Sequence, residues 1–150
     1  MNKEEVDAQA FISGFRDQFS SLPVEDISFP RGCNNLNKWS HPQSIYSKGT
    51  PIHVRGALLY NFYNKKNKLT HKYPLIQEGE KVKFVYLKTP NKINENVISY
   101  LGTFPKEFGL DKQVDYDLQF SKSFLDPIKV IMDTIGWQAE KVPSLEFLFG

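Results

Sequence analysis

Cysteine and long apolar runs are scarce in this sequence, and their scarcity excludes several classes of protein. Cys33 is the single cysteine among 150 residues, so the sequence encodes no internal disulfide and no cysteine-based zinc site. A reducing compartment is the simplest inference. No apolar run approaches the roughly 20 residues that cross a bilayer, and the acidic start, MNKEEVD, lacks the apolar segment of a secretory signal. We therefore expect no membrane association.

Histidine is also sparse, and the sequence predicts no metal site. The three histidines are separated by 12 and 18 residues, spacings that match no metal-binding motif: His41, His53 and His71. Three aspartates lie closer together and suggest an alternative, a carboxylate metal site: Asp111, Asp115 and Asp117. Acidic residues are common at the start of a helix, where they offset its dipole. We favour this second role for Asp115.

Charge is present but unevenly distributed along the chain. The net charge is +2, yet residues 48–92 hold ten Lys and Arg against two Glu, a net charge of +8. Residues 1–47 carry −2 and residues 93–150 carry −4. A basic middle between acidic ends predicts a localised surface that binds a polyanion, although a lysine-rich loop that only faces water would give the same count.

The apolar and aromatic contents, 40% and 14%, are enough for a packed core, and 150 residues fit one domain. Residues 4–20 are predicted to form an amphipathic helix, with Phe11, Phe15 and Phe19 spaced four apart. Leu22 and Pro23 end it.

A second helix is predicted from Pro51 to about Asn64. Thr50 is the expected N-cap and Pro51 the first helical residue, a combination that is frequent at helix starts. The positions expected to be buried on this helix include Ile52, Leu59, Phe62 and Tyr63.

The remaining segments predict a small sheet and a late helical block. Strands are expected at residues 24–29, ending at Pro30, at 81–88, where polar and apolar residues alternate, and at 97–100. Residues 30–49 are expected to be a long ordered loop. A helical block spans about 115–135, broken before Pro127, with Gly136 as the residue that follows its C-cap. The fold class is therefore α+β, with helices outweighing the sheet.

Five segments, which follow the same order along the chain, resemble the thumb of family B DNA polymerases, most closely those of T-even-like bacteriophages. Residues 48–61 read KGTPIHVRGALLYN, and residues 78–82 read EGEKV, which opens a strand after the helix in that family. Upstream, GCNNLNKW at 32–39 resembles the loop beside the primer–template backbone. Downstream, residues 115–116 and 124–127 resemble the late thumb helices. The resemblance covers nearly the whole chain.

The resemblance implies that residues 1–136 form a thumb that holds double-stranded primer–template DNA through its phosphates. Lys and Arg side chains and the exposed start of the second helix supply the chemistry for this. The residues expected to bind DNA are Arg31, Lys38, Lys48, Thr50, His53 and Arg55.

Motifs of the polymerase palm, of the type SLYP and DTD, and those of the exonuclease are absent from the sequence. Since two-metal phosphoryl transfer needs such carboxylates, the chain would contribute to a DNA-directed DNA polymerase, a nucleotidyltransferase, without catalytic residues of its own. It would need no cofactor, and the magnesium would lie in the palm of the complete enzyme. Palm, fingers and exonuclease would come from a separate chain or from a segment missing here.

The C-terminal residues 137–150 resemble the peptide by which such polymerases bind their sliding clamp. Leu145, Leu148 and Phe149 fall at i, i+3 and i+4, one face of a helical turn. The usual pattern has Gln three residues before the first apolar anchor, and Val142 stands there instead. Packing of this tail on its own domain is the alternative.

Two other functions remain open from the residues alone. The chain could be a stand-alone DNA-binding or clamp-regulating protein, or a small metal-dependent nuclease that uses the aspartates at 111–117. A phage polymerase would act in the cytoplasm of the infected bacterial host.

Overall fold

The structure is a computed structural model that describes residues 2–41 and 45–140. The chain divides into two compact units. The terminal unit comprises Met1–Leu22 and Phe120–Gly150, and the central unit comprises Pro23–Gln119. The expected functional boundary between residues 136 and 137 stays a prediction.

A three-stranded antiparallel sheet organises the central unit. Its strands are β1 (Phe29–Gly32), β2 (Lys81–Tyr86) and β3 (Val97–Tyr100), in the order β1-β2-β3. In this register Phe84 lies between Phe29 of β1 and Ser99 of β3. The strands predicted at 81–88 and 97–100 are confirmed, and so is the α+β class.

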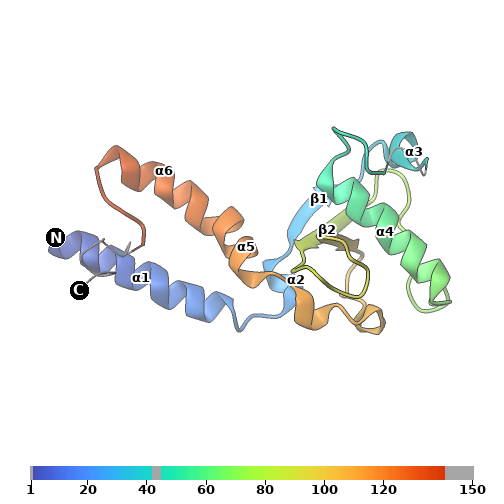
Figure 1. Cartoon of the computed structure of the whole chain (residues 1–150), viewed down its shortest axis with the longest axis horizontal. Coiled ribbons are helices and arrows are strands. Elements are labelled where there is room, and N and C mark those ends of the chain that lie inside the picture. Colours follow the sequence, from blue (N-terminus) through green and yellow to red (C-terminus); the bar gives the residue numbers. More distant parts are fainter. Residues whose placement is uncertain (1, 42–44, 141–150) are drawn as a thin grey trace. The chain divides into compact units, whose positions relative to one another are not determined.

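Helix α4 (Ile52–Lys66) lies over the sheet and packs mainly on β3 (Figure 1). Positions 54, 57, 60 and 64 are buried at intervals of three to four residues, as expected for a helix with one face on a sheet. The buried residues of α4 are Val54, Gly56, Ala57, Leu59, Tyr60 and Asn64. Leu59 is buried as predicted. Phe62 was expected to be buried but is 56% exposed, because it points away from the sheet.

The segment expected to be a strand at 24–29 contains a short helix instead, α2 (Val24–Ile27), and the strand begins only at Phe29. Pro23 precedes the helix with an extended backbone and its carbonyl accepts the Asp26 amide at 3.0 Å. Pro30 does not end the strand. It lies within β1, which is an edge strand and can accommodate a residue that lacks an N–H group.

Buried polar groups fix α2 against the sheet. The side chain of Gln119 is fully buried, accepts the Tyr86 amide at 2.9 Å and donates to the Ile27 carbonyl at 2.8 Å. The Lys83 ammonium donates to the Glu25 carbonyl at 3.0 Å. A buried amide with both of its ends paired ties a strand to the helix beside it.

The expected loop at 30–49 contains most of β1 and a further short helix, α3 (Leu36–Trp39), which contacts α4. Asn35, before α3, has the left-handed backbone (φ 64°) that Asn tolerates better than most residues. Two 3₁₀ turns, η1 (Lys106–Phe108) and η2 (Asp111–Gln113), complete the central unit.

In the terminal unit, α1 (Lys3–Phe19) confirms the helix predicted at 4–20. Asn2 caps it by accepting the Glu4 amide at 2.7 Å. Phe15 contacts two rings of the later helices, at centroid distances of 5.8 Å to Phe120 and 4.7 Å to Phe124. These aromatic pairs join α1 to the C-terminal half of the unit.

The late helical block is not broken before Pro127, contrary to expectation. Helix α5 (Tyr116–Phe120) continues through a π-helical turn, η3 (Ser121–Leu125), into α6 (Asp126–Thr134). In this wider turn the Asp126 amide donates to the carbonyl of Ser121, five residues earlier. Proline normally ends a helix because it clashes with the preceding turn, and the π turn provides the room.

Gly136 follows the C-cap as predicted. It has φ +76°, its amide donates to Asp133 at 3.1 Å and the Trp137 amide donates to Met132 at 2.9 Å. This is the Schellman arrangement, which glycine favours. None of the helices in the described ranges is both long enough and apolar enough to cross a membrane.

Candidate nucleic-acid interface

The start of α4 was expected to form an anion site, and its N-cap residue differs from the prediction. Pro51, not Thr50, is the N-cap, with an extended backbone (φ −58°, ψ 140°), so the helix begins at Ile52. The Pro51 side chain makes no capping hydrogen bond. Thr50 lies in the preceding turn, where its amide donates to Ser47 at 3.2 Å. Proline has no side-chain acceptor, so the N-cap residue itself leaves the first-turn amides uncapped.

The structure brings Arg31 and His53 together around Phe84. Arg31 lies on the edge strand β1, with its guanidinium 5.8 Å from the Phe84 ring, and donates to the Pro30 carbonyl at 2.7 Å. The His53 ring, in the first turn of α4, lies 6.2 Å from the same phenyl ring. Its Nε2 is 3.1 Å from the Gly32 carbonyl. Two candidate residues far apart in sequence thus share one surface.

The environment of His53 lowers the pKa of its imidazole below the usual value of 6.5. Burial is the main cause, and the positive charge of Arg31 adds to it, while the bond to Gly32 acts in the opposite direction. The neutral ring donates from Nε2 to the Gly32 carbonyl. Near neutral pH the positive charge at this position therefore belongs to Arg31.

Arg55 lies on a different side of α4 from His53, because two residues correspond to a rotation of about 200° around a helix. Its Nη2 donates to Asn96 Oδ1 at 2.8 Å. Its Nε is buried and has no hydrogen-bond partner among the described residues. Tyr46 and Glu95, which hydrogen-bond to each other, are its neighbours. The six candidates therefore do not form a single cluster.

Lys38 and Lys48 are exposed on the segment that precedes α4. Lys38 lies in α3, with its ammonium 4.9 Å from the Trp39 ring, and Lys48 lies in the turn before α4. Long exposed cations on this segment can reach phosphates without being buried.

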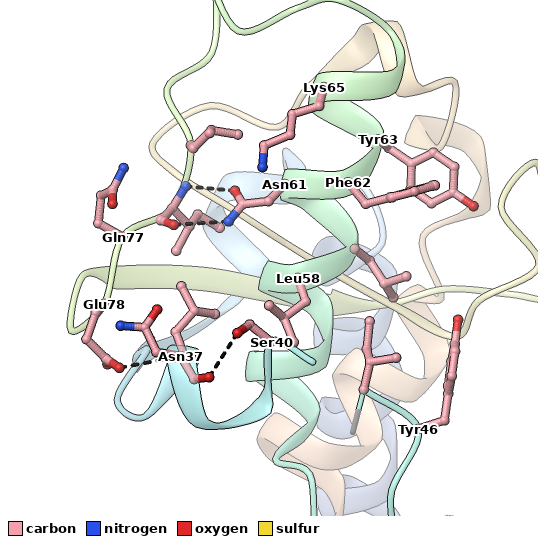
Figure 2. Close-up of a pocket in the computed structure, with 15 residues that line it drawn as sticks. Asn37, Ser40, Tyr46, Leu58, Asn61, Phe62, Tyr63, Lys65, Gln77 and Glu78 are labelled. Carbon is pink, nitrogen blue, oxygen red and sulfur yellow. Dashed lines mark hydrogen bonds between the residues drawn. The ribbon is translucent and has the colours of Figure 1, made fainter. Parts of the chain in front are cut away.

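Sequence reasoning missed a cavity of about 640 Å³ between α3, α4 and residues 75–78 (Figure 2). Tyr46 and Phe62 line it and are 62% and 56% exposed. Phe62 was assigned to the core from its helical spacing. The sequence does contain a signal for this site, because aromatic residues and lysines are concentrated at residues 60–66.

The expected clamp-binding residues, Leu145, Leu148 and Phe149, lie outside the described residues. The first part of the predicted tail is described and packs on α1. The Gln138 amide donates to Glu5 at 2.9 Å, Gln9 donates to the Gln138 carbonyl at 2.9 Å, and Arg16 pairs with Glu140.

One of the three aspartates at 111–117 has a structural role. Asp115 accepts the Leu118 amide at 3.0 Å and so caps α5, as predicted. Across the described ranges, no three His, Cys, Asp or Glu residues are grouped as metal ligands would be. Burial, with the charges of Glu78 and Glu80, raises the pKa of the Cys33 thiol to about 11. Cys33 therefore stays protonated and is a poor nucleophile.

The two units differ in net charge. The central unit has 14 basic and nine acidic residues, a net charge of +5, whereas the described part of the terminal unit has four basic and seven acidic residues, a net charge of −3. The central unit is thus the part suited to a polyanion.

No protein-family model matches the sequence. The chain is 27% identical over 154 aligned residues to the DNA-directed DNA polymerase of Enterobacteria phage T4. The alignment covers the whole chain but only 17% of that polymerase. This similarity identifies a DNA polymerase-related region.

Proposed function

We propose that this chain is the thumb portion of a phage replicative DNA polymerase of family B. Its central unit would hold primer–template duplex by the phosphate backbone, and its C-terminal residues would bind a sliding clamp. The observation that carries the proposal is the similarity to the T4 polymerase along the entire chain. The polymerase motifs quoted above support the same assignment, and the host cytoplasm would be its place of action.

The duplex-binding surface would consist of the start of α4 with the cations around it. Arg31 supplies an exposed guanidinium, Lys38 and Lys48 supply flexible ammonium groups, and the first-turn amides of α4 add backbone donors. Contacts of this kind are independent of base sequence. A replicative polymerase has to bind every sequence alike, so backbone contacts suit this role.

Nucleotidyl transfer would be carried out by the rest of the polymerase, which would hold the catalytic magnesium ions. The present chain spans 17% of the relative, and its contribution would be to keep template and enzyme together. A clamp contact would add to this by raising the effective concentration of polymerase at the template.

Direct measurement of duplex binding tests the proposal. Fluorescence anisotropy with two blunt duplexes of unrelated sequence should give equal affinities that fall steeply with salt. A clear preference for one sequence would instead support a regulatory DNA-binding protein, and no binding at low salt would overturn the assignment of this surface.

A further inference from the structure

The cavity beside α4 has walls that are fixed without any ligand (Figure 2). Asn61 accepts the Ile76 amide at 2.8 Å and donates to the Ile76 carbonyl at 3.0 Å, so both ends of its side chain hold residues 75–78 against α4. Glu78 accepts the Asn37 amide at 3.3 Å and joins the same segment to α3. The cavity is therefore preformed, which lowers the entropic cost of binding.

Two exposed aromatic rings border this cavity and are held in place. Tyr46 is 62% exposed, yet its hydroxyl donates to Glu95, which restrains the ring. Phe62 is 56% exposed and packs edge-on against Tyr63 at a centroid distance of 5.0 Å. Rigid aromatic faces open to solvent are the surfaces on which nucleic-acid bases stack.

The charge around the rings favours a nucleic acid over an apolar peptide. Lys65 lines the cavity, and Lys66 follows it on α4 with its ammonium 5.7 Å from the Tyr63 ring. Two carboxylates lie near the rings, and both accept hydrogen bonds: Glu78 from the Asn37 amide and Glu95 from the Tyr46 hydroxyl. The central unit as a whole carries +5. Aromatic rings next to cations are typical of sites for single-stranded nucleic acid.

We propose that this cavity binds an unpaired base of a single-stranded DNA extension, with Tyr46 and Phe62 as stacking surfaces and Lys65 as a phosphate contact. The inference rests on the proposed duplex site at the other end of α4. Phe62 lies nine positions after His53 on α4, a rise of about 14 Å along the helix axis, which equals roughly four steps of a stacked strand. A strand leaving a duplex held at the start of α4 can therefore reach the cavity within a few nucleotides.

The test compares a blunt duplex, the same duplex with an eight-nucleotide single-stranded extension, and the extension alone, each bound to the full chain. The extension carries 2-aminopurine, whose fluorescence falls on stacking, at successive positions. We expect quenching at one position and an affinity gain from the extension. Phe62→Ala and Tyr46→Ala should each remove the quenching and weaken binding of the extended duplex at least about five-fold, the low end for one base–aromatic stack.

Phe11→Ala is the matched control, since Phe11 is 69% exposed but belongs to the terminal unit. It should leave binding of all three DNAs unchanged. Phe62→Trp, which keeps a stacking surface, should retain the quenching. Unchanged melting temperatures would show that the variants are folded, as expected for substitutions at exposed positions.

The outcomes separate this inference from the proposed function. Binding of the blunt duplex with no gain and no quenching from the extension would overturn the cavity assignment and leave the duplex site intact. Quenching of the extension alone, lost in Phe62→Ala, with no binding of the blunt duplex, would support the cavity and refute the duplex site. A third outcome would also overturn the proposal. If an apolar peptide bound saturably, if Phe62→Ala abolished that binding, and if DNA did not displace the peptide, the cavity would belong to a protein partner instead.

Discussion

Gly56 of α4 lies so close to Ser99 of β3 that a Cβ atom on the glycine would stand 2.5 Å from the serine Oγ and 2.8 Å from its backbone nitrogen. The Ser99 hydroxyl also donates to the His53 carbonyl at 2.8 Å. One residue of β3 thus accommodates the middle of α4 and fixes its first turn. The position of the candidate DNA-binding surface depends on this close approach.

Gly56→Ala should therefore lower the free energy of unfolding by about 1–3 kcal/mol, because the backbone of β3 has to move to admit one methyl group. Urea denaturation measures the change. Gly14→Ala in α1 is the matched control, since a Cβ there meets nothing within 4 Å. It should stabilise its helix by about 0.5–1 kcal/mol. Equal effects of the two substitutions would contradict the steric argument.

Duplex binding should weaken with salt in proportion to the phosphates contacted. With about three to five contacts, log K against log [salt] should have a slope of about −3 to −4.5. Arg31→Ala, Lys38→Ala and Lys48→Ala should each flatten it by about one, for every duplex sequence. Arg55→Ala should have the same effect on the slope. It should in addition lower the melting temperature, because Asn96 loses the guanidinium that donates a hydrogen bond to its side chain.

Lys129→Ala is the control for this series, because Lys129 is exposed on α6 of the acidic terminal unit. The slope of log K against log [salt] for Lys129→Ala should equal that of the wild type. A change as large as that of Arg31→Ala would indicate that net charge, and not the surface near α4, governs binding.

His53 should make stability and DNA binding respond to pH in opposite directions. Its pKa in the folded chain lies below 6.5, so the unfolded chain binds the proton more readily. The stabilising contribution of the neutral ring is complete above about pH 6.5 and is lost as the pH falls through the lowered pKa. Protonation meanwhile adds a positive charge beside Arg31, so duplex affinity should rise.

Melting temperatures and duplex affinities measured from pH 5 to 8 test both trends. His53→Gln should flatten both curves, whereas His71→Gln, at an exposed position in the same unit, should retain them. Identical pH profiles for the wild type and His53→Gln would refute the role of His53.

The proposed clamp contact should reside in residues 141–150, because residues 137–140 already pack on α1. A synthetic peptide of residues 141–150 should bind the cognate clamp with a Kd in the micromolar range. Three apolar anchors contribute roughly 1.5–3 kcal/mol each, and ordering the peptide offsets much of this.

Leu145→Ala, Leu148→Ala or Phe149→Ala should abolish peptide binding in calorimetry. Phe147→Ala is the matched control, since the helical spacing that groups the three anchors would put position 147 on the opposite face, and it should retain most of the affinity. In the full chain, the anchor substitutions should leave duplex binding and the melting temperature unchanged. A fall of several degrees would place these side chains in the core of the chain itself.

Nucleotide incorporation should be absent from the isolated chain with any divalent metal, since the sequence lacks the palm carboxylates that two-metal transfer requires. A primer-extension assay, with the T4 polymerase as the positive control, measures this. Incorporation that copurifies with the 150-residue chain would refute the assignment as a thumb portion.

The sequence alone determined the elements whose signals are local. The apolar spacing of α1, the alternation along β2 and the glycine after α6 each reflect one turn or one face of the chain, so they were predicted near their observed positions. The polymerase resemblance likewise followed from contiguous motifs. The strand at Phe29–Gly32 could not be predicted from local sequence, because Pro30 is compatible with a strand only when that strand lies at the edge of the sheet.

Only the tertiary structure decided which candidate residues share a surface. Helical spacing assigned Phe62 to the core, yet the sheet covers the opposite side of α4 and leaves Phe62 beside a cavity. His53 and Arg55 are neighbours in sequence, but α4 directs one toward Arg31 and the other toward Asn96. Burial and pairing depend on what packs against each face of a helix, and residues distant in the sequence supply that packing.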